Sequence, residues 1–111
     1  MFFNTYSAPS AFDRSVLYDA LSEFISVSKV DYIPKWKKTQ LNSQAIEAKE
    51  KLEKCAVDFD IRDIQAMLAA SMLMLSCLED IAEPDNETIR QINACTRNIN
   101  FCKDIFDDIP I

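Results

Sequence analysis

The sequence contains no glycine. Glycine is the residue that most readily adopts positive φ angles, which tight hairpin turns and phosphate-binding loops require. Its absence argues against a sheet of short hairpins and excludes the Gly-rich nucleotide-binding motifs. Long helices joined by short polar loops tolerate this lack best, so the composition favours an all-α protein.

Histidine is also absent, which removes the commonest general acid or base and the commonest metal ligand. His-based triads and HExxH zinc sites are therefore excluded. Any catalysis would depend on Asp, Glu, Lys, Tyr or Cys, and nothing in the sequence places two carboxylates in an apolar pocket. We expect a protein that is not an enzyme and that needs no cofactor or metal.

The four cysteines, Cys55, Cys77, Cys95 and Cys102, lack the paired CxxC spacing of structural zinc sites. Cys95 and Cys102 share a helical face but lie about 10 Å apart along it, too far for a disulfide. We interpret the cysteines as small core residues and keep a thiol enzyme or metal protein as a third hypothesis. The first residues lack the features of a secretory signal, so we expect a cytoplasmic protein with reduced thiols.

Four apolar-periodic segments predict one helical domain over residues 1–111, with helices near residues 11–28, 34–57, 61–82 and 86–107. Ser10, Asp60 and Asp85 stand where N-caps are expected. Short connections between long amphipathic helices favour an up-down antiparallel four-helix bundle. The aromatic residues 1–9 predict an extended N-terminal arm, and the pattern leaves open whether the second helix is interrupted near residues 39–43.

The third helix is predicted to be the centre of the fold, because no charge occurs in the thirteen residues from Ala66 to Leu78. A helix that is apolar all round has to be covered all round, and this one is shorter than the ~20 apolar residues that span a membrane. We therefore expect no membrane association. The second helix has only a thin apolar stripe, so it can leave one face of the third helix open as a dimer interface or partner groove.

Charge is unevenly distributed along the chain. Residues 63–111 carry three Lys/Arg against nine Asp/Glu and account for the whole net charge of −6. An acidic half favours a basic partner, although it can also serve only solubility. Acidic residues at the C-terminal end of a helix oppose its dipole, which makes Asp104, Asp107 and Asp108 candidate partner-binding residues.

One basic cluster follows the first helix and consists of Lys29, Lys35, Trp36, Lys37 and Lys38. Lysines beside an aromatic ring can bind phosphates and stack a base, so a nucleic-acid-associated regulator is the alternative function. Nucleic-acid binders usually carry a basic footprint over the whole domain. A solvated loop that Trp36 anchors in the core is therefore the favoured interpretation, and nucleic-acid binding is not expected.

The functional hypothesis is a small non-catalytic protein that acts by binding another protein. Inhibitors, immunity-like proteins and accessory subunits of phages or mobile elements share this type of composition, which is an analogy only. The apolar surface that a polar second helix fails to cover predicts a homodimer. The candidate partner-binding residues are Asp104, Asp107, Asp108, Lys35, Trp36, Lys37, Lys38, Phe2, Phe3 and Tyr6.

Overall fold

The computed structural model describes residues 10–27, 30, 32–54 and 59–107. These residues form four α-helices: α1 (Ala11–Ser26), α2 (Lys35–Glu53), α3 (Ile61–Glu79) and α4 (Asn86–Asp107). The described part contains no strand, and one isolated antiparallel bridge joins Val30 to Ile33. The predicted all-α fold with four helices is confirmed. The predicted N-terminal arm, residues 1–9, lies outside the described residues.

The helix ends follow local capping chemistry. The backbone N–H of Asp13 donates to Ser10 Oγ (3.2 Å) at the start of α1, and that of Thr88 donates to Asp85 Oδ1 (2.8 Å) at the start of α4. Asp60 and Asp63 form a full capping box at α3. All three predicted N-caps are thus confirmed. The first and third helices end earlier than expected, at Ser26 and Glu79, and α2 is described only to Glu53.

The second helix runs without interruption from Lys35 to Glu53, which answers the question that the sequence left open at residues 39–43. Its thin stripe is buried, namely Leu41, Ala45, Ala48 and Leu52. Lys38 is buried beside this stripe at 3% exposure. Its ammonium donates to the carbonyls of Phe24 and Val27, both at 2.8 Å, at the end of α1. A cation suits the negative end of a helix dipole, so Lys38 fastens α2 to the end of α1.

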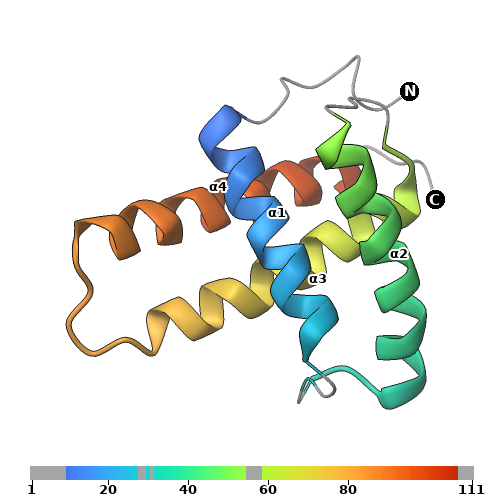
Figure 1. Cartoon of the computed structure of the whole chain (residues 1–111), viewed down its shortest axis with the longest axis horizontal. Coiled ribbons are helices and arrows are strands. Elements are labelled where there is room, and N and C mark those ends of the chain that lie inside the picture. Colours follow the sequence, from blue (N-terminus) through green and yellow to red (C-terminus); the bar gives the residue numbers. More distant parts are fainter. Residues whose placement is uncertain (1–9, 28–29, 31, 55–58, 108–111) are drawn as a thin grey trace.

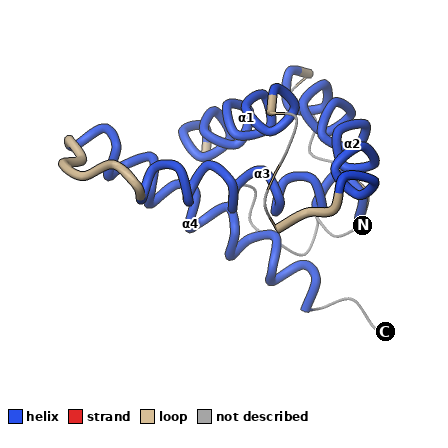
Figure 2. Tube along the Cα trace, turned by 90° about the horizontal axis from the view of Figure 1, so that it is seen from below, coloured by secondary structure: helices blue, strands red, loops and turns tan. Residues whose placement is uncertain are grey.

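Figure 1 shows two antiparallel pairs, with α1 running opposite to α2 and α3 opposite to α4. In the same view α1 crosses the α3–α4 pair, and Figure 2 places α1 over one side of α3. The central helix α3 packs against α1, α2 and α4, whereas α2 and α4 barely touch each other. Because α1 also packs against the three other helices, the predicted central position of the third helix is shared with α1.

Polar contacts at two places fix the pairs to each other. Arg97 on α4 makes a bidentate contact with Asp13 on α1, through Nε to Oδ2 (2.9 Å) and Nη2 to Oδ1 (2.8 Å). Asn98 Nδ2 donates to the Asp13 carbonyl at 3.0 Å. On the other side, Lys51 of α2 is paired with Asp63 of α3, whose side chain is fully buried. Since Asp13 is also nearly buried, both carboxylates specify how the helices dock.

The uncharged segment of α3 is covered over only part of its length. Its N-terminal half contributes Ile64, Ala66, Met67 and Ala70 to the main core around Phe24 and Leu21. From Met72 to Asn93 no residue is buried. The expectation that the whole apolar run is covered on all sides was therefore wrong, because the second half of α3 is covered only in part, by Val16 of α1 and by Ala94 and Cys95 of α4.

Candidate partner-binding surfaces

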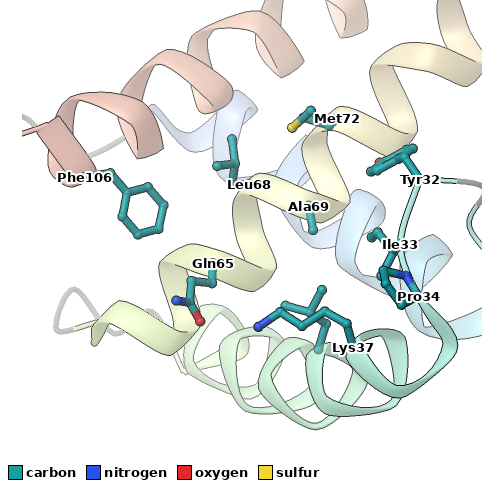
Figure 3. A pocket seen from close by; sticks show the side chains of 10 residues that line it. Tyr32, Ile33, Pro34, Lys37, Gln65, Leu68, Ala69, Met72 and Phe106 are labelled. Atoms are coloured by element: carbon teal, nitrogen blue, oxygen red, sulfur yellow. The ribbon is translucent and has the colours of Figure 1, made fainter.

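A groove follows the face of α3 that none of the other helices covers. Because α2 and α4 barely touch, the strip of α3 between them stays open. Figure 3 shows side chains from the 32–34 linker, α2, α3 and the end of α4 around this space. The groove has a volume of about 380 Å³ and is lined by Tyr32, Ile33, Pro34, Lys37, Leu41, Gln65, Leu68, Ala69, Met72 and Phe106.

The polar groups of the groove are mainly hydrogen-bond donors. Lys37 contributes an ammonium group, and it has no ion-pair partner among the described residues. The side-chain oxygen of Gln65 accepts from Gln44 Nε2 (3.1 Å), so its amide nitrogen remains as a donor. Partial burial, together with the nearby Cys77, raises the pKa of Tyr32 and keeps its hydroxyl protonated. No carboxylate lines the groove, which therefore favours an apolar ligand surface carrying an acceptor or a negative charge.

The second exposed surface is the hairpin, which we define as residues 72–93. It comprises the C-terminal half of α3, the turn and the first two turns of α4, and Figure 1 shows it extending beyond α1. Met72 is 42% exposed, Ile81 44% and Ile89 43%. Its inner side packs at its base, where Met74, Leu75 and Leu78 contact the cluster of Val16, Ala94 and Cys95. Met72, Ile81 and Ile89 therefore remain as exposed apolar side chains on the hairpin.

Acidic side chains surround the apolar residues of the hairpin turn. Glu79, Asp80, Glu83, Asp85 and Glu87 are all exposed. Two of them have local roles, since Asp85 caps α4 and Glu87 pairs with Arg90 at 3.2 Å. For Glu79, Asp80 and Glu83 no ion pair joins them to other described residues. The tip of the hairpin is thus both apolar and negative.

The predicted basic cluster is split by the structure. Lys35 and Trp36 are exposed, the latter at 70%, and Lys37 lines the groove. Lys38 is buried and also donates to Asn42 Oδ1 (2.6 Å), so its assignment as a partner-binding residue was wrong. The idea that Trp36 anchors this segment in the core was wrong as well. Trp36 is exposed, and the side chain of this segment that is buried against the end of α1 is Lys38. Lys29 lies outside the described residues.

Two further predicted partner-binding residues that the structure describes, Asp104 and Asp107, do not line the groove. Both are exposed on α4. Asp108, Phe2, Phe3 and Tyr6 lie outside the described residues. The sequence did indicate the open face of α3, from the polar character of α2. It did not single out Tyr32, Gln65 or Phe106, because nothing in their local pattern marks them as neighbours.

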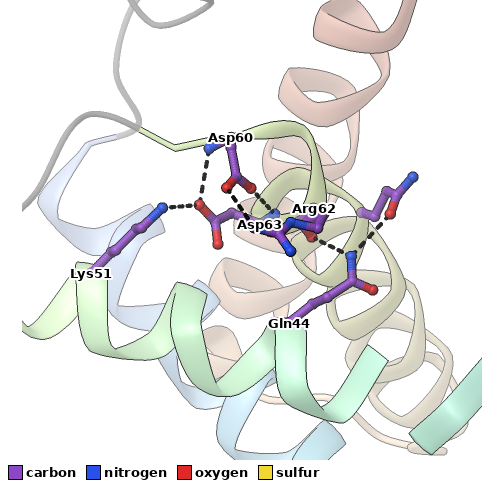
Figure 4. Close-up of polar contacts among 6 residues, drawn as sticks. Gln44, Lys51, Asp60, Arg62 and Asp63 are labelled. Carbon is purple, nitrogen blue, oxygen red and sulfur yellow. Dashed lines mark hydrogen bonds and ion pairs between the residues drawn. The ribbon is translucent and has the colours of Figure 1, made fainter. Parts of the chain in front are cut away.

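Polar groups at the junction of α2 and α3 form the cluster in Figure 4, in which Asp63 and Gln44 are buried. The backbone N–H of Asp60 donates to Asp63 Oδ2 (2.9 Å), and that of Asp63 to Asp60 Oδ1 (3.0 Å). The hydrogen bond to Asp63 raises the pKa of Lys51, whereas the backbone N–H of Asp63 lowers the pKa of Asp60. These groups satisfy the start of α3 and join it to α2, which is a structural role.

The cysteines differ in their environments. Cys95 and Cys102 are buried, and burial raises their pKa values to about 11 and about 12. Both thiols therefore stay protonated at neutral pH, and their interpretation as core residues is confirmed. Cys77 is exposed on the hairpin, contrary to that interpretation, and Cys55 lies outside the described residues. Within the described ranges, no three potential ligands converge on a metal site.

Comparison with protein-family models, curated proteins and solved structures finds no match for this chain. By length and composition alone, α3 qualifies as a membrane-spanning helix, a test that core helices of soluble proteins also pass. This observation alone does not identify α3 as a membrane-spanning segment.

Proposed function

We propose that this protein acts without catalysis, by binding another protein through the open face of α3. The observation that carries the proposal is the groove of about 380 Å³ between α2 and α4, continued by the uncovered hairpin. Soluble proteins seldom leave contiguous apolar surface exposed without a partner. An inhibitor, an immunity-like protein or an accessory subunit in the cytoplasm would act in this stoichiometric way.

The proposal includes the finer architecture. We infer an up-down bundle of four helices that is closed around the first half of α3 and open along one side of it. In this arrangement an amphipathic helix of the partner can lie along α3 as an additional neighbour, with its apolar side chains at positions three or four residues apart. The donor groups of Lys37 and Gln65 then favour an acidic or acceptor group on that partner.

The alternative function is nucleic-acid binding by the basic cluster. Exposed Lys35 and Trp36 support it. However, the ammonium of Lys38 is buried and donates to a carbonyl at the end of α1, so it is not available for phosphate binding. The protein as a whole also carries a net charge of −6. Phosphate binding weakens steeply with salt, so titration of labelled single-stranded DNA at two salt concentrations separates this function from apolar docking.

Site-specific photo-crosslinking in the native host tests the protein-binding function. A photoreactive side chain at Ala69 in the groove should yield an adduct of discrete mass. The same group at Glu23, an exposed position on α1, is the matched control and should yield none. Adding Met72→Asp to the Ala69 probe should abolish the adduct. Equal labelling from both positions, or no adduct at Ala69, would contradict the proposal.

A further inference from the structure

Two surfaces of this chain are complementary to each other. The groove is apolar, contains the ammonium of Lys37 and has no carboxylate in its lining. The hairpin tip exposes Ile81 beside Asp80 and Glu83. An apolar positive recess and an apolar negative projection meet the two conditions of a specific contact, which are shape and opposite charge.

The two surfaces lie at opposite ends of one straight strip of α3. Gln65, Leu68, Ala69 and Met72 line the groove, and the helical period continues this strip through Ser76 to Glu79. Ser76 and Glu79 are both exposed. The centre of the groove and the tip are therefore separated by about 16 Å, the rise of roughly eleven helical residues.

A two-fold axis near the middle of this strip brings both contacts together at once. In an antiparallel pair of α3 helices, Met72 of one copy lies opposite Ser76 of the other. The same register places Asp80 of each copy opposite Leu68 in the groove of the other, with Ile81 beside it in the turn. Ala69 and Ser76 are small, so the helices can approach at the usual interaxial distance of about 8–10 Å.

We propose that the groove takes the hairpin tip of a second copy of this chain, so that two copies exchange tips in a closed dimer. This deepens the proposed function, on which it rests, by naming the partner. A closed two-fold pair uses each surface twice and leaves neither exposed. Asp80 and Glu83 of one copy face Lys37 of the other, and the dimer weakens as salt screens these pairs.

A different protein with an acidic apolar helix would satisfy the groove but would leave the hairpin tip uncovered. A different basic protein would satisfy the tip but would leave the groove open. The second copy satisfies both surfaces, and it also accounts for their placement on one strip of α3. That is the reason to favour self-association over either alternative.

Charge exchange between the two surfaces tests the arrangement. The groove variant is Lys37→Glu, and the tip variant combines Asp80→Lys with Glu83→Lys. Each variant alone sets like charges against each other, so its dimer dissociation constant should rise about tenfold or more. An equimolar mixture should recover the dimer, because the acidic groove of one variant accepts the basic tip of the other. Analytical ultracentrifugation reads the change between 12.7 kDa and twice that mass.

Two controls accompany the exchange. Glu23→Lys combined with Glu50→Lys changes two exposed acids on α1 and α2, so it alters net charge equally and should leave the dimer intact. Circular dichroism establishes that each variant is folded. Lysine near the end of α3 suits the helix dipole, so the tip variant should retain its helix content.

The possible results separate this inference from the proposed function. A monomeric parent chain overturns the dimer, and so does a dimer that neither variant weakens. If the parent chain is monomeric and the Ala69 probe still captures a different protein, the dimer fails while the proposed function stands. If the probe captures nothing and the chain is monomeric, both fail.

Discussion

The two halves of α3 carry similar side chains in opposite environments. Ile64, Ala66, Met67, Ala70 and Ser71 in the first half are all buried, whereas no residue from Met72 to the end of the helix is. The first half packs against α1 and α2, whereas the second half extends beyond α1 with α4 beside it (Figure 1) and meets α1 at Val16. Hydrophobicity along a helix thus shows what needs to be covered. The lengths and positions of the other helices decide which part of that apolar surface is covered.

The comparison also separates what stabilises the fold from what is available for binding. The polar contacts between helices described above, such as those of Asp13 with Arg97 and of Lys51 with Asp63, lie outside the hairpin. The hairpin instead has exposed apolar residues and three acids, Glu79, Asp80 and Glu83, that form no ion pair with other described residues. Changes in the packed half should therefore alter stability, and changes in the hairpin should alter association.

The largest expected effect comes from removing a core side chain. Phe24 is fully buried, and Phe24→Ala should lower the free energy of unfolding by about 3–5 kcal/mol, because it leaves a cavity. Ile89→Ala on the hairpin is the control and should change it by less than about 0.5 kcal/mol. Urea denaturation, carried out at low protein concentration, measures both. Similar losses for the two variants would remove the distinction between the packed half and the hairpin.

Neighbouring lysines provide the next test. Lys38→Ala should lower the free energy of unfolding by about 1–3 kcal/mol, since the carbonyls of Phe24 and Val27 lose a buried donor. Lys37→Ala, one residue away, should leave stability within about 0.5 kcal/mol. Thermal unfolding of the two variants gives the comparison. An equal effect from both would mean that Lys38 does not hold the end of α1.

This pair of lysines also shows how far the sequence alone reaches. Helix number and three N-caps followed from periodicity and capping residues, which are local signals. The different roles of Lys37 and Lys38 did not, because both are lysines in one basic run. Their roles differ because Lys38, and not Lys37, donates hydrogen bonds to the carbonyls at the end of α1, which is separate in the sequence. The groove likewise joins Tyr32, Leu68 and Phe106 from separate segments, and only the fold brings them together.

A smaller effect is expected at the start of α3. The backbone N–H of Asp63 lowers the pKa of Asp60 in the folded state, so the charged cap adds stability above the unfolded pKa of about 3.9. That stability is lost as the pH falls through the folded value. The side chain of Asp60 is 45% exposed, and solvent screening keeps the contribution to at most about 1 kcal/mol.

Asp60→Asn isolates this contribution, because asparagine is an equally good N-cap that does not titrate. The variant should lose less stability than the parent chain between pH 7 and pH 3, when both are measured by urea denaturation. Other carboxylates titrate equally in both proteins and cancel in the comparison. An unchanged pH dependence would show that the charge of Asp60 contributes nothing to the cap.

The last test leaves stability unchanged and reads the two environments directly through the thiols. Cys77 lies exposed on the hairpin, whereas Cys95 and Cys102 are buried with pKa values raised to about 11 and about 12. The thiolate is the reactive species, so iodoacetamide at pH 8 should modify Cys77 rapidly and the buried pair only when the fold opens. Mass spectrometry of a Cys55→Ser variant follows the three sites. Rapid labelling of Cys102 in the folded protein would contradict the packed arrangement of α4 against the core. If the hairpin enters a second copy, the rate at Cys77 should also fall as the protein concentration rises, whereas the Lys37→Glu variant should show no such dependence.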